Sequence, residues 1–451
     1  MSAIGAGLQR GEEGSEEAEV ELTFMPEKIL FKYIDEPGQD TVKVYMKHGG
    51  YTALPKVLKE YTPDQVTEIV KESGLRGRGG AGFPAGVKWS FVPKDSPKPK
   101  YLLINADESE PGTFKDRQLL ERDPHQLIEG SIIAAYAVQA HIGFIYIRGE
   151  FGYGAKQLLR ALSEAEEKNF LGKNILGSGY DLEIHLHRGG GAYICGEETA
   201  LMESIEGKRG LSRVRPPYPA IVGLYGCPTV INNVETLSNV PHIINKGAEW
   251  FASIGTPKST GTKIFSLSGQ VKRPGNYELP MGISLRELIY EYGGGIFEDR
   301  KLKAVIPGGS STPILTPDKL DVKLDFESVV EAGSMLGSAG VIVMDETTCM
   351  VNVAWRLTRF YQHESCGKCT PCREGTYWML KILERIENGK GEPGDVDLLL
   401  DICNYIEGYT VCPLGDAAVP AVRSTIEHFR EEYDYHIKNK ACMVKGKPVF
   451  K

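Results

Sequence analysis

The sequence predicts an α/β fold with a mainly parallel sheet, followed by a small β-grasp module and a helical C-terminal domain. Three observations lead to this fold class. Strand-like and helix-like segments alternate between Tyr101 and Gly207, as in a parallel sheet covered by helices. Two strand-like segments and one helix follow Lys263. From Thr347 onward the pattern is helical, with cysteines in the loops between helices.

The composition is that of a globular protein with several cores. The 451 residues are enough for about three domains, and 41% apolar and 25% charged residues are typical of such chains. A net charge of −8 argues against non-specific binding to nucleic acid, which needs a basic face. The most apolar stretch, 127–147, contains Glu129, Gln139 and His141 and is too polar to span a membrane.

We expect residues 1–24 to form a mobile, solvated acidic arm. The run from Glu12 to Glu17 is rich in glutamate, the reverse of a mitochondrial transit peptide. The N-terminus also lacks the basic-then-apolar pattern of a signal peptide. The residues that follow, Leu22 to Tyr51, have the pattern of short strands and turns.

A helix is predicted next, and a glycine-dense loop follows it. Thr62 is the expected N-cap, Pro63 takes the first helical position and Gln65 completes a capping box. The loop formally contains G-x-G-x-x-G at Gly77, Gly79 and Gly82. A helix rather than a strand precedes it, so it does not match the dinucleotide-binding fingerprint.

The same loop has the chemistry of a phosphate-binding segment. Its glycines allow close approach of a ligand, and free backbone N–H groups can face a phosphate. Arg76, Arg78 and Lys88 add positive charge. The alternative is a flexible loop without a ligand.

The predicted α/β domain spans residues 25–255, with an N-terminal extension to about 75. Its expected elements alternate in order: strand Tyr101–Asn105, helix Pro124–Val138, strand Ile142–Arg148, helix Ala155–Glu167, strand Leu182–His187 and helix Gly196–Gly207.

Two loops that follow strands carry clustered carboxylates. Asp107, Glu108 and Glu110 come directly after the first strand, where open α/β sheets bind ligands. Glu197 and Glu198 open a helix after the glycines of 188–196. Either glutamate can accept hydrogen bonds from ribose hydroxyls. The alternatives are a solvated acidic turn and simple helix capping.

Two further domains are expected, at 256–338 and 339–451. A stretch rich in Gly, Ser, Thr and Lys at 256–262 marks the first boundary. The β-grasp module contains strands at 264–268 and 275–279 and a helix begun by the capping box of Ser284 and Glu287.

The helical domain contains a cysteine pattern typical of a [4Fe-4S] cluster. Cys366, Cys369 and Cys372 are spaced two residues apart, and Cys412 supplies a distant fourth thiol. Zinc is the rival, because it also binds four cysteines, although structural zinc sites usually pair them as two C-x-x-C units. The other five, Cys195, Cys227, Cys349, Cys403 and Cys442, have no pairing pattern. Free thiols predict a reducing, cytoplasmic or matrix-like compartment.

Five segments in order resemble the NADH-binding flavoprotein subunit of respiratory complex I, NADH:quinone oxidoreductase. The resemblance extends from about Tyr51 to Tyr433, and the mass of 49.6 kDa agrees with the roughly 51 kDa type. The segments are Gly77-Arg-Gly-Gly-Ala-Gly-Phe-Pro, Asn105-Ala-Asp-Glu, Tyr193-Ile-Cys-Gly-Glu-Glu-Thr-Ala, Asn232-Asn-Val-Glu-Thr and Glu364-Ser-Cys-Gly-Lys-Cys-Thr-Pro-Cys-Arg.

The resemblance implies FMN and NADH in a Rossmann-like α/β domain and a [4Fe-4S] cluster in the helical domain. FMN would contact Gly77, Arg78, Gly79, Lys88, Asn105, Asp107, Glu108, Gly196, Glu197, Asn232 and Asn233. NADH would lie against Gly80, Gly82, Phe83, Lys88, Phe91, Glu110, Glu198 and Tyr218. The β-grasp module resembles the soluble-ligand-binding type and is expected to be a structural spacer.

The chain departs from the family pattern in three places. Tyr218 stands where family members often carry Phe, and Thr410 precedes Val-Cys412 where Ser is usual. The acidic first 20 residues match nothing in the family.

The implied reaction is hydride transfer from NADH to FMN, then transfer of single electrons to the cluster and on to quinone. No residue is expected to act as a general acid or base, because the cofactors supply the chemistry. The implied partners are a small [2Fe-2S] subunit and a larger iron-sulfur subunit. The expected location is cytoplasmic, on the inner face of a bacterial inner membrane, reached through partner subunits alone.

Two other functions fit parts of the sequence. The diaphorase subunit of an NAD-linked hydrogenase, including bifurcating ones, or of a formate dehydrogenase shares the same core. Such chains often carry an additional cysteine-rich domain, whereas no cysteine precedes Cys195 here. A non-enzymatic scaffold with structural zinc would instead be colourless and free of flavin.

Overall fold

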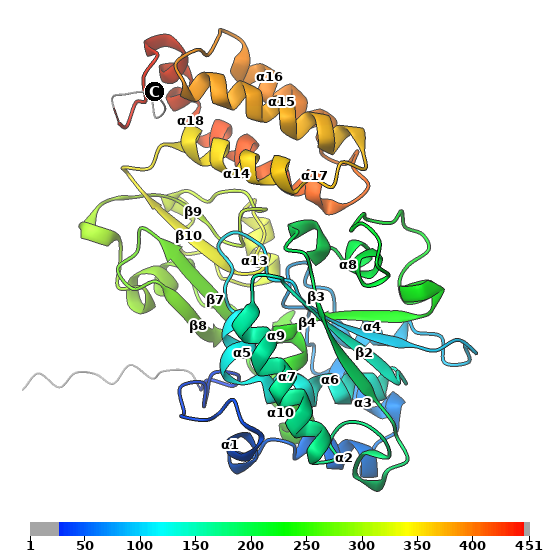
Figure 1. The fold of residues 1–451 in the computed structure, drawn as a ribbon. Helices are drawn as coiled ribbons and strands as arrows, with labels where there is room; N and C mark the ends of the chain where they lie inside the picture. The colour runs from blue at the N-terminus through cyan, green and yellow to red at the C-terminus, as the bar shows by residue number, and fades with distance from the viewer. Residues whose placement is uncertain (1–26, 446–451) are drawn as a thin grey trace, which may run out of the picture.

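The computed structural model describes residues 27–445, and these form three units that follow one another along the chain (Figure 1). The predicted acidic arm at 1–24 lies outside the described residues. The first unit contains a four-stranded sheet in the order β3-β2-β1-β4. All of its neighbouring strands are parallel, which confirms the predicted α/β class. The strands are β1 (Tyr101–Ala106), β2 (Ile142–Ile147), β3 (Glu183–Arg188) and β4 (Thr229–Asn233).

Helices cover this sheet because connections between parallel strands must cross its faces. Helix α6 (Pro124–Ala137) is buried on nearly every side, which explains why its sequence shows no polar face. The unit also contains α3 (Pro63–Glu72), α4 (Ala85–Ser90), α5 (Asp116–Arg122), α7 (Gly152–Glu167), α8 (Glu198–Ile205), α9 (Val234–Ser238), α10 (Val240–Lys246) and α11 (Ala248–Ala252). The predicted capping box of Thr62 and Gln65 is present.

The segment before Tyr51 differs from the prediction. It contains turns and the helix α1 (Val42–Lys47), and no strand is found between 27 and 51. A second helix, α2 (Ala53–Glu60), follows. The Val42 N–H donates to Glu164 Oε2 at 2.7 Å, so a carboxylate far along the chain supports the start of α1.

The second unit has a mixed sheet in the order β8-β7-β10-β9. Its strands are β7 (Thr262–Gly269), β8 (Gly275–Pro280), β9 (Leu302–Ile306) and β10 (Gly340–Asp345), with β10 parallel to β7 and the other pairs antiparallel. The predicted capping box at Ser284 begins α12 (Leu285–Glu287), which continues as a π-helix over Leu288–Tyr292. Two short strands, β5 (Gly255–Thr256) and β6 (Ser259–Thr260), precede this sheet. Helix α13 (Phe326–Glu331) shares a core with β7 and β10 through Phe326 and Val329.

The boundary expected at 338 falls before β10. This strand lies between β7 and β9 in the second sheet, so residues 340–345 belong by hydrogen bonding to the second unit. The helical unit then begins with α14 (Met350–Glu364).

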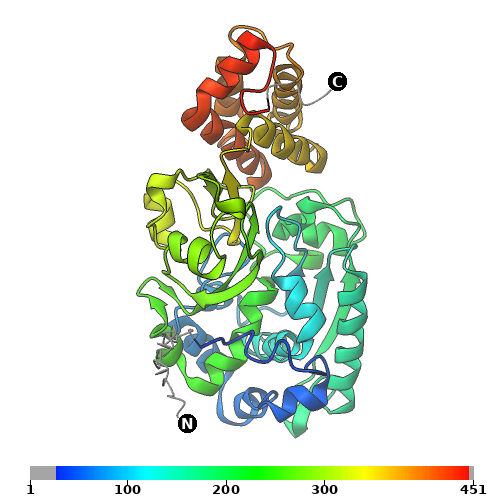
Figure 2. The ribbon, with the colours of Figure 1, turned by 90° about the vertical axis from the view of Figure 1, so that its left-hand side faces the viewer.

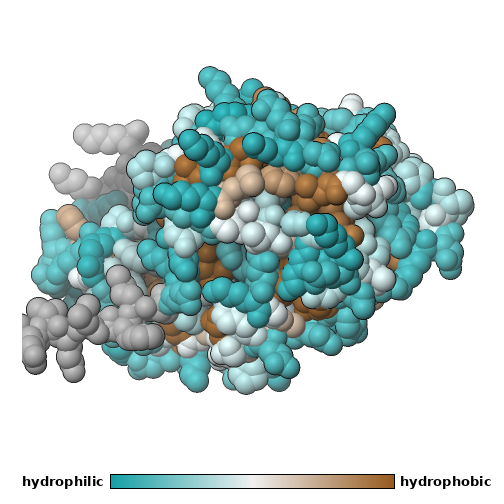
Figure 3. All heavy atoms as spheres, turned by 90° about the horizontal axis from the view of Figure 1, so that it is seen from below, coloured by the Kyte–Doolittle hydropathy of each residue, from teal (hydrophilic) through white to brown (hydrophobic). Residues whose placement is uncertain are grey.

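Five helices form the third unit, at the top of Figure 1 and set apart from the rest in Figure 2. After α14 come α15 (Thr370–Glu387), α16 (Asp395–Ile406), α17 (Pro413–Ala418) and α18 (Pro420–Asn439). No helix within 27–445 is long and apolar enough to cross a membrane. The face at the bottom of Figure 1, far from the helical unit, is largely hydrophilic, with smaller apolar areas between polar side chains (Figure 3).

Candidate functional site

The loops predicted from sequence meet at the carboxyl edge of the parallel sheet. Asn105, the last residue but one of β1, donates from Nδ2 to the Gly196 carbonyl at 2.8 Å. Strand β4 pairs in register with β1, so that Asn233 lies opposite Asn105. The glycine loop reaches the same edge, because a side chain at Gly79 would lie 3.0 Å from Asn233 Cβ. Four segments that are far apart in sequence therefore meet at the carboxyl ends of β1 and β4.

Within the first glycine-rich loop, glycine is required at position 82. The Gly77 N–H donates to the Phe83 carbonyl at 2.8 Å and closes the loop. Gly82 has φ +64°, and a Cβ there would come within 2.5 Å of the Phe326 ring. A Cβ atom added at Gly80 would have no heavy atom within 4 Å, so this part of the loop faces open space.

Asp107 is half-buried at this edge and carries one fully buried carboxylate oxygen, Oδ2. Its Oδ2 has no hydrogen-bond partner among the described residues, although Ser109 Oγ donates to Oδ1 at 3.3 Å. Burial raises the pKa of Asp107 to about 7. A side chain at Gly196 would stand 3.5 Å from Oδ2. An orphaned carboxylate oxygen beside a glycine fits a ligand with hydroxyl donors.

Glu197 and Glu198 have different roles. Glu197 Oε2 accepts from the N–H groups of Thr199 and Ala200, each at 3.0 Å, so Glu197 caps α8 as the simpler interpretation predicted. Glu198 lies between two cations, with Lys88 Nζ at 3.2 Å and Arg215 Nη1 at 2.7 Å.

Arg215 is a site residue that the sequence did not reveal. Its second amino group donates to Glu197 Oε1 at 2.8 Å, so one guanidinium binds both glutamates. The only signal was its place directly before the Pro-Pro-Tyr218-Pro segment.

Lys88 and its neighbour fasten α4 to the end of β4. Lys88 Nζ donates to the Ile231 carbonyl at 3.0 Å, and Trp89 Nε1 donates to Asn232 Oδ1 at 2.8 Å. Asn232 is buried. Both predicted FMN contacts, Lys88 and Asn232, are thus fixed in position at the edge of the sheet.

Two predicted FMN contacts have their side chains engaged inside the protein. The Arg78 guanidinium is fully buried and donates to the carbonyls of Arg76, Thr260 and Thr262 at 2.7–3.2 Å. Burial lowers its pKa to about 10. Asn233 Nδ2 donates to Asp116 Oδ2 at 2.6 Å. FMN contacts by these residues stay predictions.

The acidic turn after β1 is also bound internally. Glu108 accepts from the N–H groups of Asp116 and Arg117 at 2.8 and 3.0 Å, at the start of α5. Burial, with the Asp116 charge next, raises the pKa of Glu108 to about 7. Glu110 accepts from the Tyr193 hydroxyl at 2.6 Å and from the Ser311 N–H at 2.8 Å. Their contacts with FMN and NADH likewise stay predictions.

Three aromatic rings predicted to lie against NADH are exposed. Phe83 and Phe91 are 46% and 54% exposed, and their ring centroids are 6.1 Å apart. Tyr218 is 60% exposed. Exposed rings beside a charged loop can stack on a planar ligand.

The four predicted cluster ligands converge at one end of the helical unit. Cys366 and Cys369 lie between α14 and α15, Cys372 is in the first turn of α15, and Cys412 immediately precedes α17. Burial is the main cause that raises the pKa of the Cys372 thiol to about 11, and the charges of the other three cysteines add to it. All four belong to one packed cluster of side chains. Their donor set fits a [4Fe-4S] cluster.

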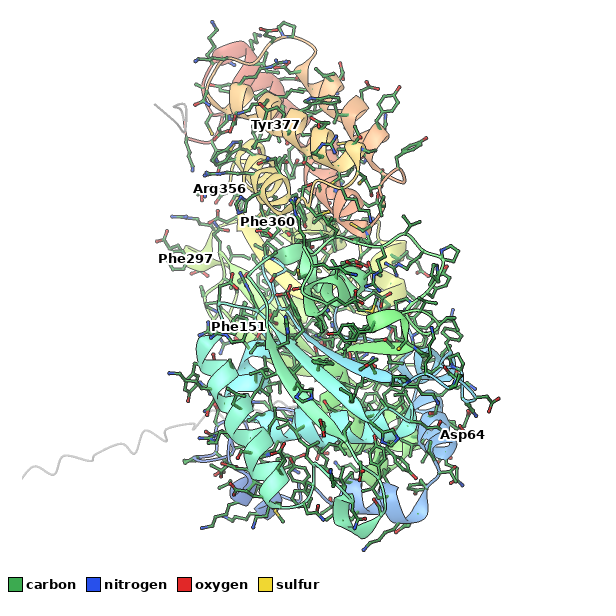
Figure 4. All side chains as sticks on the ribbon, turned by 45° about the vertical axis from the view of Figure 1, so that its right-hand side comes forward. Asp64, Phe151, Phe297, Arg356, Phe360 and Tyr377 are labelled. Carbon is green, nitrogen blue, oxygen red and sulfur yellow. The ribbon has the colours of Figure 1, made fainter. Side chains whose placement is uncertain are left out.

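Loop 188–198 joins the sheet edge to the segment that carries Cys366 and Cys369. The Tyr193 N–H donates to Glu364 Oε2 at 2.8 Å, and its ring lies 5.1 Å from that of Phe360. Figure 4 shows Phe360 on α14 near the α/β unit. Lys368 Nζ donates to the Ser212 carbonyl at 2.5 Å. The two halves of the site are therefore adjacent.

Comparisons with known proteins agree with this architecture. Residues 70–242 match the family described as the Nuo51 FMN-binding domain, 263–343 match the SLBB domain, and 352–436 match the NADH-ubiquinone oxidoreductase-F iron-sulfur binding region. The middle match confirms the soluble-ligand-binding type expected for the second unit.

Curated relatives are similar over nearly the whole chain. The second F subunit of NADH-quinone oxidoreductase from Rhizobium meliloti (strain 1021) is 57% identical, covering 93% of this chain and 99% of that protein. The corresponding F subunit from Mycobacterium tuberculosis (strain ATCC 25618 / H37Rv) is 55% identical, covering 92% and 94%. The air-oxidized crystal structure of an NAD+-reducing [NiFe]-hydrogenase has a TM-score of 0.79 and 37% identity, covering 91% of this chain and 67% of that chain. From its domains, its fold and these relatives, the chain belongs to the family of NADH-quinone oxidoreductase F subunits.

Proposed function

We propose that this chain oxidises NADH and passes the electrons singly to partner subunits that reduce quinone. FMN, when bound, accepts a hydride and releases electrons one at a time, and a [4Fe-4S] cluster carries single electrons. The observation that carries the proposal is that loop 188–198 contacts both places where these groups would bind. Gly196 accepts from Asn105 at the sheet edge, and Tyr193 donates to Glu364 beside the cysteines.

FMN is proposed to lie at the carboxyl edge of β1 and β4. The orphaned Asp107 oxygen suits a hydroxyl donor, Lys88 supplies positive charge, and glycine at 79 and 196 allows close approach. The residues proposed to hold FMN are Gly77, Arg78, Gly79, Lys88, Asn105, Asp107, Glu108, Gly196, Glu197, Asn232 and Asn233. Arg78, Glu108 and Asn233 would contribute chiefly by fixing the backbone around the ligand, because their side chains already have internal partners.

NADH is proposed to enter over the exposed rings of Phe83, Phe91 and Tyr218. Glu198 would accept hydrogen bonds from a ribose, since its carboxylate is held in place by two cations. Gly80, Gly82, Lys88 and Glu110 complete the proposed set. These residues would bind and orient the dinucleotide, and none of them would need to move a proton, because the ligands themselves supply the hydride chemistry.

The cluster half of the proposal can be tested at its most distant ligand. Replacement of Cys412 by Ser should lower the iron content well below about four per chain, because it removes one of four thiolates. NADH–ferricyanide activity, in which electrons leave the flavin directly, should stay within about twofold, whereas electron delivery to partner subunits should fall at least about 100-fold. Iron analysis, electron paramagnetic resonance and both assays measure this.

The matched control for this test is Cys403→Ser, a buried thiol in the same unit whose Sγ contacts Met379 Sδ at 3.6 Å. It should keep its iron. Full iron and full electron delivery in Cys412→Ser would contradict the assignment of Cys412.

The whole proposal is tested on the anaerobically purified chain. We expect flavin absorption together with a broad thiolate–iron shoulder near about 400 nm, both bleached by NADH. A colourless protein with stoichiometric zinc and no flavin would overturn the proposal and favour the scaffold alternative.

A second candidate function is supported by the likeness to the NAD+-reducing hydrogenase structure. In that case the same core would exchange electrons with a hydrogenase or formate dehydrogenase partner. The 55–57% identity to quinone-reducing relatives favours the first candidate. Affinity purification from native membranes, followed by assays with quinone, hydrogen and formate, distinguishes the two.

A chain of this family works as one subunit of a larger enzyme. The proposed neighbours are a small [2Fe-2S] subunit and a larger iron-sulfur subunit, which would receive electrons from the cluster. The proposed place is the cytoplasmic face of a bacterial inner membrane. Cross-linking of the native complex would identify the neighbours.

A further inference from the structure

The helical unit contains a second group of metal-ligand side chains, far from the four cluster cysteines. Cys349, His436 and Cys442 bring one ligand atom each within 4.8 Å of one another. All three side chains are buried, with exposures of 2%, 1% and 0%. Cys349 immediately precedes α14, His436 lies in the last turn of α18, and Cys442 follows α18. Sequence spacing gave no sign of this group, because its members are distributed over three separate places.

The distances within the group suit a tetrahedral metal ion. Cys349 Sγ lies 3.6 Å from His436 Nε2. A zinc ion with bond lengths of about 2.3 Å to sulfur and about 2.05 Å to nitrogen would place these two ligand atoms about 3.6 Å apart at the tetrahedral angle. The atoms are thus already at the separation that shared coordination requires.

The histidine is oriented as metal-ligating histidines are. His436 Nδ1 lies 2.6 Å from the Glu432 carbonyl oxygen. A carbonyl accepts only, so Nδ1 carries the proton and Nε2 presents its lone pair toward Cys349. This hydrogen bond from Nδ1 fixes the tautomer, as metal-ligating histidines commonly do with the ring nitrogen that does not bind the metal.

Glu387 lies beside the group, outside the set of atoms that are all within 4.8 Å of one another. Its Oε2 lies 3.7 Å from His436 Nε2 and, although the residue is only 1% exposed, accepts no hydrogen bond from any described residue. Its Oε1 accepts from Asn352 Nδ2 at 2.8 Å, which holds the carboxylate in place. A nearby cation would satisfy this buried carboxylate oxygen, as a proton would.

The Cys442 sulfur has the surroundings of a thiolate ligand. The Lys445 N–H donates to Cys442 Sγ at 3.3 Å, and amide donors of this kind stabilise sulfur that carries negative charge.

We propose that Cys349, Cys442 and His436 bind a structural zinc ion, with the Glu387 carboxylate turning toward it as the fourth ligand. Two thiolates, an imidazole and a carboxylate are a ligand set that zinc takes, and four protein ligands close the site to substrate. Helix α14 separates the zinc site from Cys366, because its 15 residues span about 22 Å. The ion would fasten the segment after α18 to the start of α14 and the end of α15, at the end of the bundle opposite the cluster.

Metal analysis of the full-length chain, purified without chelators, tests this. We expect about one zinc per chain in addition to the cluster iron. The double variant Cys349→Ser, Cys442→Ser should lose at least about 90% of the zinc and keep its iron. The control Cys403→Ser alters a buried thiol of the same unit outside the group and should keep both metals.

X-ray absorption at the zinc edge gives a second measurement on the unmodified chain, in case the double variant fails to fold. The expected shell has two sulfur atoms at about 2.3 Å and two nitrogen or oxygen atoms at about 2.0 Å. A shell of four sulfurs, meaning zinc in the cluster cysteines, would overturn the proposal. So would zinc below about 0.1 per chain after reconstitution with zinc chloride, or an intact mass showing a Cys349–Cys442 disulfide.

Discussion

Glu198 is the residue whose charge should decide which nicotinamide dinucleotide is used. It is held by Lys88 and Arg215, so its carboxylate cannot turn away from a bound ribose. A 2′-phosphate placed against this oxygen would meet like charge. Arg215, which pairs with Glu198, would be available to a 2′-phosphate if the carboxylate were removed. The preference between NADH and NADPH therefore depends on this one carboxylate.

Replacement of Glu198 by Gln should therefore lower the preference for NADH over NADPH about tenfold, since one repulsive contact is removed and Arg215 is released. The ratio of kcat/KM for the two substrates, with ferricyanide as acceptor, measures this. Glu203→Gln, which removes a carboxylate bound to Arg213 instead, should leave the ratio unchanged. NADPH turnover that does not rise in Glu198→Gln would sink the assignment.

If FMN binds at Asp107 as proposed, its binding should depend on pH. Burial raises its pKa to about 7, so the free protein holds a proton there in weakly acidic solution. A ligand hydroxyl that donates to Oδ2 favours the ionised carboxylate, so binding must expel that proton. Affinity for FMN should consequently increase as the pH rises toward about 7 and level off above it.

Replacement of Asp107 by Asn should remove this rise, and at pH 8 it should weaken FMN binding about tenfold or more, because a charge-assisted hydrogen bond is lost. Quenching of FMN fluorescence between pH 5.5 and 8.5 measures both effects. Glu183→Gln, an exposed carboxylate at the opposite end of β3, serves as control. An unchanged slope in Asp107→Asn would contradict the role of Oδ2.

At the scale of elements, several helices begin against carboxylates from distant parts of the chain. Glu129 on α6 accepts from the Ala53 and Leu54 N–H groups at 3.1 Å, at the start of α2. Glu432 on α18 accepts from the Met350 N–H at 2.9 Å, at the start of α14. Such contacts satisfy the free N–H groups of a first turn as a local cap does. They also tie each helix to its neighbour.

Glu129→Ala should lower the free energy of unfolding of the α/β unit by about 3 kcal/mol, because it leaves several buried donors, among them the Tyr51 N–H and the Tyr45 hydroxyl, without an acceptor. Urea denaturation followed by far-ultraviolet circular dichroism measures the change. Glu60→Ala, at the exposed end of the same helix α2, should cost less than about 0.5 kcal/mol. Equal effects of the two changes would refute the capping role.

At the scale of the whole molecule, the three units meet around Glu110. This carboxylate accepts from Tyr193 of the α/β unit and from Ser310 Oγ at 3.0 Å and the Ser311 N–H of the second unit. Ser310 in turn lies 2.7 Å from the Tyr361 hydroxyl on α14. The junction fixes the helical unit relative to the proposed flavin site, and electron transfer between the two would depend on that distance.

Glu110→Ala should destabilise the assembled units by about 2 kcal/mol, because three donors lose their acceptor, and it should slow electron delivery to partner subunits more than NADH–ferricyanide turnover. Calorimetry and the two assays measure this. The KM for NADH shows whether Glu110 acts by holding the units together or by contacting the dinucleotide. A change in KM below about twofold, under about 0.5 kcal/mol, indicates that Glu110 holds the units together. Glu150→Ala, on the loop after β2, is the control.

Strong local signals made much of the fold predictable. The capping boxes at Thr62 and Ser284 and the apolar run of β1 depend on neighbours in sequence, and each is present. The segment before Tyr51 was predicted wrongly because α1 is supported by Glu164, 122 residues away. Strand β10 was placed outside the second unit because its partners β7 and β9 lie far from it in sequence.

By itself, the sequence determined the family, the cysteine spacing and the order of the loops, because these depend on residues close together in the chain. The tertiary structure decided which polar groups at those loops are free. Asp107, Glu108 and Glu110 are equivalent in the sequence, as three carboxylates in the turn after β1. Of the three, only Asp107 keeps a buried oxygen without a hydrogen-bond partner. It also brought Cys349, His436 and Cys442 together. Hydrogen bonding and metal coordination act through space, so these features appear only once distant segments are folded against one another.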